Sequence, residues 1–188
     1  MNPFRLSLFL LAVSIKSFSQ DSFWKLTIVN DVLSCNLPVN SESRQSSFIK
    51  AFGGELNSNF YGLQYYDSTF HKIENEHSFQ ISLTGFMSGR AGDSMLKGYS
   101  ALVIDTAIGG TVGLMGKFTS TDSSKFYRRV DYYVTLANNH YYWFYAYSTS
   151  PKNEKEIDSF FNSIKFDSDK LKEKTFKLTP IYLKTDQL

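Results

Sequence analysis

YRRVDYYVTLANNHYYWFYAYS, residues 127–148, is the stretch of sequence that decides the fold. Two runs rich in β-branched and aromatic residues flank the pair Asn138-Asn139, and such runs favour strands. Asparagine tolerates the positive φ angles of a type I′ turn. The segment therefore predicts a β-hairpin with a two-residue loop, in which Ala137 pairs with His140.

Alternation along the hairpin divides its side chains between two faces. The first face is expected to be core and carries Val130, Tyr132, Val134, Leu136, Tyr141, Trp143, Tyr145 and Tyr147. The second face is half polar and carries three rings, Tyr133, Tyr142 and Phe144. Coverage by helices is the favoured alternative for this face, because a sandwich buries both faces of its sheet. If the face is exposed, these three rings are the candidate ligand-binding residues.

Strand patterns also fill most of the chain before the hairpin. The predicted strands are 24–29, 32–37, 48–56, 59–66, 98–106 and 114–119. Asn57-Ser58 predicts a turn between two of them, and Gly53-Gly54 indicates a β-bulge. The Ser-rich stretch 40–47 is expected to be a loop.

Two segments instead have the period of a helix. From about residue 74 to 90, apolar side chains recur at the spacing of a core-facing helix, namely Phe79, Leu83, Phe86 and Met87. A second helix is expected to begin with Ser150 as its cap and Pro151 in its first turn. Its apolar stripe is Ile157, Phe160, Phe161 and Ile164. Together these elements predict an α+β fold, an antiparallel β-sheet flanked by two main helices.

The N-terminal residues follow the pattern of a secretory signal peptide: a positive charge, then an apolar run, then small residues. Arg5 supplies a positive charge, residues 6–15 are apolar, and small residues at 17 and 19 suit a cleavage site. A retained anchor or a buried first helix is the alternative, but the apolar run is short of the about 20 residues that span a bilayer. We expect a signal peptide over 1–19, one α+β domain over 20–166 and a charged tail over 167–188. The protein would then be exported to the periplasm or the extracellular space, with no transmembrane segment left.

The charge balance argues against a nucleic-acid-binding protein, and the cysteine content argues against a disulfide-stabilised one. Cleavage removes Arg5 and Lys16, which leaves 18 of the 20 Lys and Arg residues, equal to the 18 Asp and Glu. A neutral chain has no strong field for nucleic acid, so no nucleic-acid partner is expected. Cys35 is the single cysteine, which excludes an internal disulfide, and its flanks predict a small buried side chain.

The order of the elements resembles the PsbP-like superfamily. The similarity lies in the hairpin segments Arg128–Tyr133 and Tyr141–Trp143 and in the end of the closing helix, FFNSI at 160–164, and it spans roughly residues 23–166. The resemblance implies a small α/β/α sandwich around an antiparallel sheet. It also implies a mostly non-enzymatic role, since the family includes extrinsic photosystem II subunits and small binding or assembly factors. No family site residue has a counterpart here, and no photosynthetic manganese or calcium site is visible.

Candidate chemistry is sparse. The HKIENEH stretch offers His71, Glu74, Glu76 and His77 as metal ligands, but two histidines six residues apart lie on opposite sides of a helix. No G-x-S-x-G elbow is present, His140 is expected to be an exposed turn residue, and residues 109–113 are expected to form a sheet turn. Arg128-Arg129 near Asp131 predicts a solvated, locally paired cluster.

These observations favour a non-enzymatic exported protein that binds a partner protein or a small ligand, with no metal and no cofactor. An enzyme of unknown class and a structural domain for envelope maintenance are the two alternatives. A deep polar pocket with convergent ionisable groups would favour the enzyme, whereas a shallow aromatic groove would favour binding.

Overall fold

The structure is a computed structural model that describes residues 23–66, 73–171 and 177–178. Two antiparallel sheets and two α-helices make up these residues, so the chain is an α+β protein dominated by its sheets. The expected signal peptide and most of the expected tail lie outside the described residues. Neither of the helices described here is long and apolar enough to cross a membrane.

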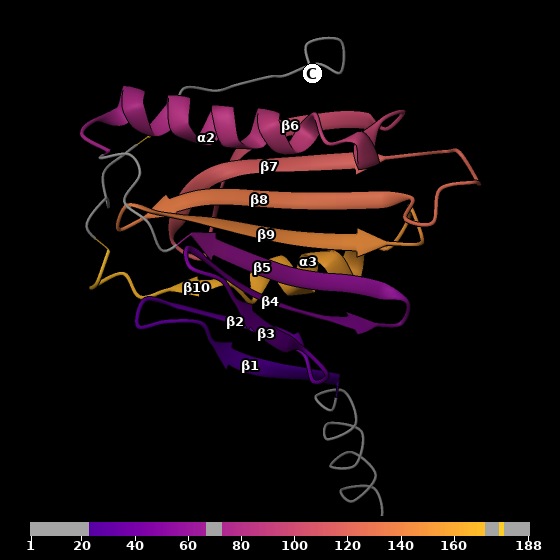
Figure 1. Ribbon diagram of the computed structural model, residues 1–188, viewed down its shortest axis with the longest axis horizontal. Helices are drawn as coiled ribbons and strands as arrows, with labels where there is room; N and C mark the ends of the chain where they lie inside the picture. Colours follow the sequence, from indigo (N-terminus) through magenta and orange to yellow (C-terminus); the bar gives the residue numbers. More distant parts are fainter. Residues whose placement is uncertain (1–22, 67–72, 172–176, 179–188) are drawn as a thin grey trace, which may run out of the picture.

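The larger sheet contains seven strands in the order β3-β4-β5-β9-β8-β7-β6 (Figure 1). The strand bounds are β3 Glu42–Gln45, β4 Ile49–Leu56, β5 Asn59–Tyr66, β6 Ser100–Ile108, β7 Thr111–Thr119, β8 Arg129–Ala137 and β9 His140–Ser148. The smaller sheet has the order β1-β2-β10, with β1 Trp24–Ile28, β2 Leu33–Pro38 and β10 Lys165–Phe166.

The central hairpin has the predicted register. Ala137 pairs with His140, and Asn138 and Asn139 have φ angles of 52° and 65°. The turn between β4 and β5 is built in the same way, with Asn57 and Ser58 also at positive φ. Both hairpins therefore follow directly from local turn chemistry.

One face of the large sheet is covered by the small sheet and by helix α3, Glu154–Asn162 (Figure 1). The predicted stripe of α3 is buried there, with Ile157, Phe160 and Phe161 all 4% exposed or less. Leu33, Cys35 and Leu37 of β2 belong to the same core. The core under this layer includes side chains from β4 to β6 of the large sheet.

Helix α2, Glu76–Ala91, packs on the opposite face, mainly against β7 and β8. Asn75 and Ser78 form a capping box at its start, and the predicted residues Phe79, Leu83 and Met87 are buried against the sheet. A short 3₁₀ helix, η2 Ser94–Leu96, follows. Figure 1 shows α2 beside β6 and β7, well away from β3 and β4. The half of this face that α2 leaves open holds the candidate site.

Three local predictions are wrong. The stretch 40–47 contains a strand, β3, whose four residues are all exposed and which exists through backbone pairing with β4. Gly53 and Gly54 pair regularly with Gly62 and Tyr61, without a bulge. Helix α3 begins after Asn153.

The late start of α3 has a local cause. The Ser148 hydroxyl donates to the Ser150 carbonyl at 2.9 Å and accepts from the Ser150 amide at 3.1 Å. These bonds hold the chain in a turn, and such local bonds compete with helix formation.

Residues 167–171, expected in the tail, pack against the domain. Leu171 is buried, and the Lys170 ammonium donates to the Asp31 carbonyl at 2.8 Å.

Candidate functional site

The three rings predicted as ligand-binding residues are core residues. Tyr133, Tyr142 and Phe144 each have 0% of their surface exposed. The Tyr133 hydroxyl donates to the Thr111 carbonyl at 2.8 Å, and the Tyr142 hydroxyl accepts from the Asn30 amide at 2.9 Å. A ring without exposed surface cannot meet a solute, so the exposed-patch alternative does not describe this face. Coverage comes from the small sheet as well as from α3.

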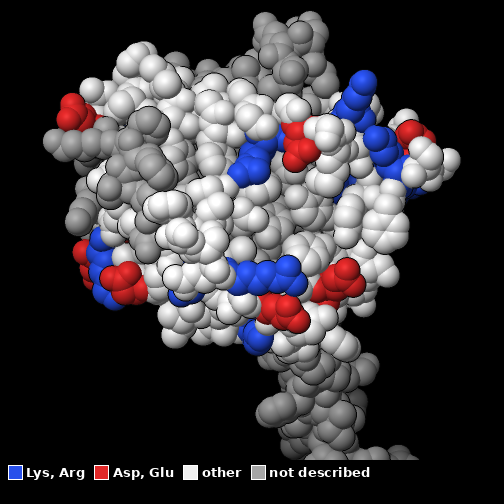
Figure 2. Space-filling view, in the orientation of Figure 1, with Lys and Arg blue, Asp and Glu red and all other residues white. Residues whose placement is uncertain are grey.

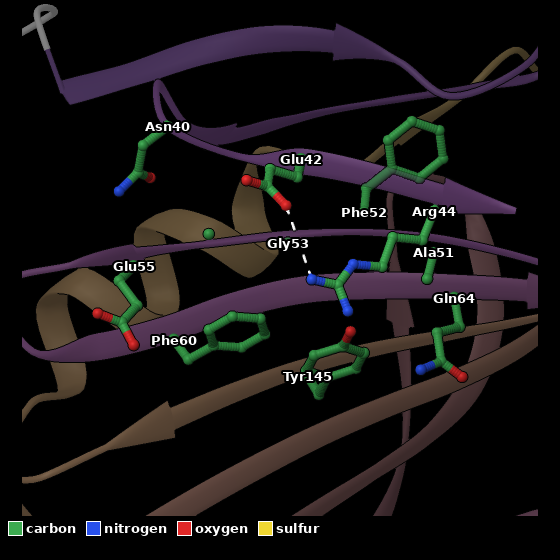
Figure 3. Close-up of a pocket in the computed structure, with 11 residues that line it drawn as sticks. Asn40, Glu42, Arg44, Ala51, Phe52, Gly53, Glu55, Phe60, Gln64 and Tyr145 are labelled. Carbon is green, nitrogen blue, oxygen red and sulfur yellow. Dashed lines mark ion pairs between the residues drawn. The ribbon is translucent and has the colours of Figure 1, made fainter.

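A pocket of about 520 Å³ lies on the opposite face, over β3, β4, β5 and β9 (Figure 3). We call it the sheet pocket. The residues that line it are Asn40, Glu42, Arg44, Ala51, Phe52, Gly53, Gly54, Glu55, Phe60, Gln64 and Tyr145. The half of the large sheet that α2 does not cover therefore carries, among the described residues, a concave surface with both aromatic and charged side chains.

The base of the sheet pocket is aromatic. Phe60 and Tyr145 have ring planes within 4° of parallel and centroids 6.0 Å apart. The two rings are stacked; Phe60 is partly buried and Tyr145 is only 7% exposed, so the aromatic surface that a ligand can reach belongs mainly to Phe60. We call these two rings the aromatic pair.

Glycines make room for the aromatic pair. A Cβ on Gly53 would lie 2.8 Å from Cζ of Phe60, and one on Gly62 would lie 2.7 Å from Cε2 of Tyr145. Gly53 and Gly62 are direct partners across β4 and β5. Each ring therefore occupies the space that a side chain would fill, and both lie against the sheet.

Polar side chains stand around the aromatic pair because strand alternation brings them to the same face. Glu42 pairs with Gly53, Arg44 with Ala51, and Ala51 in turn with Gln64. Glu55 is opposite Phe60 on the next strand. Figure 3 shows these side chains around the rings.

The charged groups at this rim remain hydrated. The Arg44 guanidinium lies 3.7 Å from the Glu42 carboxylate, and the two side chains are 86% and 77% exposed. Exposed ion pairs contribute little to stability, so both groups can turn toward a ligand at small cost. Figure 2 shows the same face, with charges of both signs beside a hollowed area of uncharged side chains.

Tyr145 supplies a neutral hydroxyl to the site. Burial, and secondarily the neighbouring Tyr147, raise the pKa of Tyr145 to about 12. The phenol therefore stays protonated at physiological pH and can donate or accept a hydrogen bond.

Helix α2 borders the open face through Arg90. Its guanidinium carbon lies 4.0 Å from the centroid of the Trp143 ring and 5.1 Å from that of Phe86. Arg90 also donates to the Tyr66 hydroxyl. This cation–π arrangement anchors the end of α2 on β9.

The remaining sequence candidates do not come together. His71 lies outside the described residues, and Glu74, Glu76 and His77 are exposed at the start of α2. Across the described ranges, no three His, Cys, Asp or Glu side chains are placed to hold a metal ion. Cys35 is fully buried, and this burial raises the pKa of its thiol to about 12.

Two charged or polar residues differ from expectation. His140 is partly buried, and its Nδ1 lies 3.1 Å from the Tyr66 carbonyl oxygen. Arg129 pairs with Asp131 as predicted, but the pair is buried and not solvated, with 4% and 1% exposure. The start of β8 lies under α3, whose Glu154 approaches Arg129 at 3.5 Å.

Sequence reasoning missed the sheet pocket for two reasons. Glu42 and Arg44 were expected in a loop, where no face can be assigned to them. Tyr145 was expected to be core, and it is indeed only 7% exposed. The paired glycines on β4 and β5 were the available signal, since Gly in a strand interior often marks a close approach.

Comparisons with known proteins bring no further assignment. No protein-family model matches the chain, and a search of curated proteins finds no match either.

Proposed function

We propose that this protein is an exported, non-enzymatic binding domain that holds a small ligand in the sheet pocket. The observation that carries the proposal is the aromatic pair lying on glycines in a pocket of about 520 Å³. Known ligand sites have volumes of about 300–1,000 Å³ and combine apolar surface with a few polar groups that orient the ligand. The sheet pocket has this composition.

The state of the rim supports binding over catalysis. A catalytic carboxylate is usually placed in a dry environment that shifts its pKa toward the reaction. Glu42 and its partner Arg44 are instead mostly exposed to water. Such groups are suited to exchanging hydrogen bonds with a polar ligand.

Export and fold ancestry belong to the same proposal. The charge, apolar run and small residues at the N-terminus support a cleaved signal peptide. The large sheet with α2 on one face and α3 on the other supports a variant of the PsbP-like sandwich, extended by the small sheet. If the peptide is cleaved, mass spectrometry of the secreted protein finds Gln20 at the N-terminus; a chain that retains residues 1–19 contradicts export with cleavage.

Binding is tested by amide NMR of the isotopically labelled protein with a panel of neutral sugars, amines, amino acids and small carboxylates. The expected result is a shift of the Gly53 and Gly62 amides by at least one class of probe. Arg44→Ala should weaken that shift. Gln45→Ala is the matched control, because Gln45 is the next residue on β3 and faces the other side. If no probe perturbs the sheet pocket, the proposal fails.

A further inference from the structure

We infer that the ligand of the sheet pocket is a neutral saccharide, an inference that rests on the proposed function. The first support is the Phe60 ring, which lines the sheet pocket, is only partly buried and stacks on Tyr145. A single accessible aromatic face suits a flat ligand, whereas recognition of a quaternary ammonium uses several rings arranged as a cage. The C–H face of a pyranose ring is flat and weakly positive, and it complements the negative face of an aromatic ring.

The second support is the mixture of donors and acceptors. The carboxylates of Glu42 and Glu55 accept hydrogen bonds, the Arg44 guanidinium donates them, and the Gln64 amide does both. A sugar hydroxyl is both a donor and an acceptor. A saccharide therefore satisfies every group of this rim, with several hydroxyls distributed around one ring.

The same rim disfavours charged ligands. Two carboxylates repel an organic anion, and Arg44 offsets part of their attraction for a cation. A neutral ligand leaves the Glu42–Arg44 pair balanced and meets both of its partners by hydrogen bonding. The pocket volume of about 520 Å³ is enough for a short oligosaccharide.

The test is a titration of the wild-type protein with cellotetraose, chitotetraose and mannotetraose, followed by amide NMR and calorimetry. Choline, spermidine and citrate serve as charged probes at matched concentration. We expect at least one oligosaccharide to shift the Gly53 and Gly62 amides, and none of the charged probes to do so.

Variants of Phe60 identify the contact. Phe60→Leu keeps an apolar side chain but removes the aromatic face, and we expect it to weaken saccharide binding about ten-fold. Phe60→Tyr keeps the face and should bind within about two-fold of the wild type. Circular dichroism and thermal unfolding of both variants confirm that each is folded.

The outcomes separate this inference from the proposed function. If choline, spermidine or citrate shifts the pocket amides and no saccharide does, the saccharide inference is wrong while the proposed function stands. If a saccharide binds but Phe60→Leu leaves its affinity unchanged, the aromatic pair is not its platform and the inference is again wrong. If no probe of any kind shifts these amides, both fail.

Discussion

The guanidinium of Arg129 donates to the carboxylate of Asp131 inside the protein, with Nη2 2.7 Å from Oδ2 and Nε 3.0 Å from Oδ1. The two residues are one alternation apart on β8 and share a face. Burial raises the pKa of Asp131, and Arg129 opposes this increase. The pair also reaches Glu154 in the first turn of α3, so it joins the helix to the sheet.

Arg129→Met should therefore destabilise the protein strongly. It leaves Asp131 buried without its partner, a change that typically costs about 3–5 kcal/mol. Urea denaturation measures the free energy of unfolding. The double variant Arg129→Met with Asp131→Leu should recover most of the loss, and the exposed Arg44→Met should change little. A single variant as stable as the wild type would show that the pair is dispensable.

Phe144→Ala should reduce the free energy of unfolding by about 3–5 kcal/mol, because the ring is fully buried between the two sheets. Phe126→Ala is the matched control, since that ring is 72% exposed and surface changes usually stay within about 0.5 kcal/mol. Chemical denaturation of both proteins checks the difference. Equal stability of the two variants would mean that the covered face is not core.

Glycine positions on the sheet and on α2 should respond in opposite ways to alanine. In Gly62→Ala the new Cβ would lie 2.7 Å from the Phe52 carbonyl oxygen, and such overpacking costs about 1–3 kcal/mol. A Cβ on Gly85 of α2 has nothing within 4 Å, and alanine favours a helix by about 1 kcal/mol over glycine. In thermal unfolding, the Tm of Gly85→Ala should be higher than that of the wild type, and the Tm of Gly62→Ala should be lower. The reverse order would contradict the close approach at Gly62.

Stability should fall in alkaline solution between about pH 10 and 12. Burial raises the pKa of Tyr133 and of Tyr145 from 10.0 to about 12. An unfolded tyrosine releases its proton near pH 10, whereas the folded residue retains it, so folding is favoured fully below pH 10 and progressively less above it. Each pH unit in this interval costs at most about 1.4 kcal/mol per tyrosine.

Urea denaturation at pH 8, 10 and 11, together with the ultraviolet absorbance of tyrosinate, checks this dependence. Tyr133→Phe should flatten part of the alkaline slope, because the buried ring then has no proton to lose. A slope that is unchanged in this variant would assign the alkaline loss to other groups.

The elements that formed as predicted are those set by local chemistry. Asn138-Asn139 and Asn57-Ser58 take the positive φ angles of two-residue turns, so both hairpins, and the register of the β8–β9 hairpin, were visible in the sequence. The apolar stripes of α2 and α3 were visible for the same reason, since a helix repeats over a few residues.

Tertiary contacts decided the rest. Both faces of the hairpin are aromatic, and alternation does not say which distant segment packs on each. The pairing of β1, β2 and β10 and their packing with α3 buried Tyr133, Tyr142 and Phe144. In the part of the chain that the structure describes, no helix covers the opposite face over β3, β4 and β5.

The candidate site depends on the packing of distant segments even more than the buried face does. Strand β3 has no buried side chain, so only its backbone pairing with β4 makes it a strand and places Glu42 and Arg44 over the sheet. By itself the sequence determined the hairpins, the helix stripes and the two faces of each strand, because these depend on neighbours along the chain. Which face was covered and where the pocket opened depended on packing between segments far apart in the chain, which local patterns do not encode.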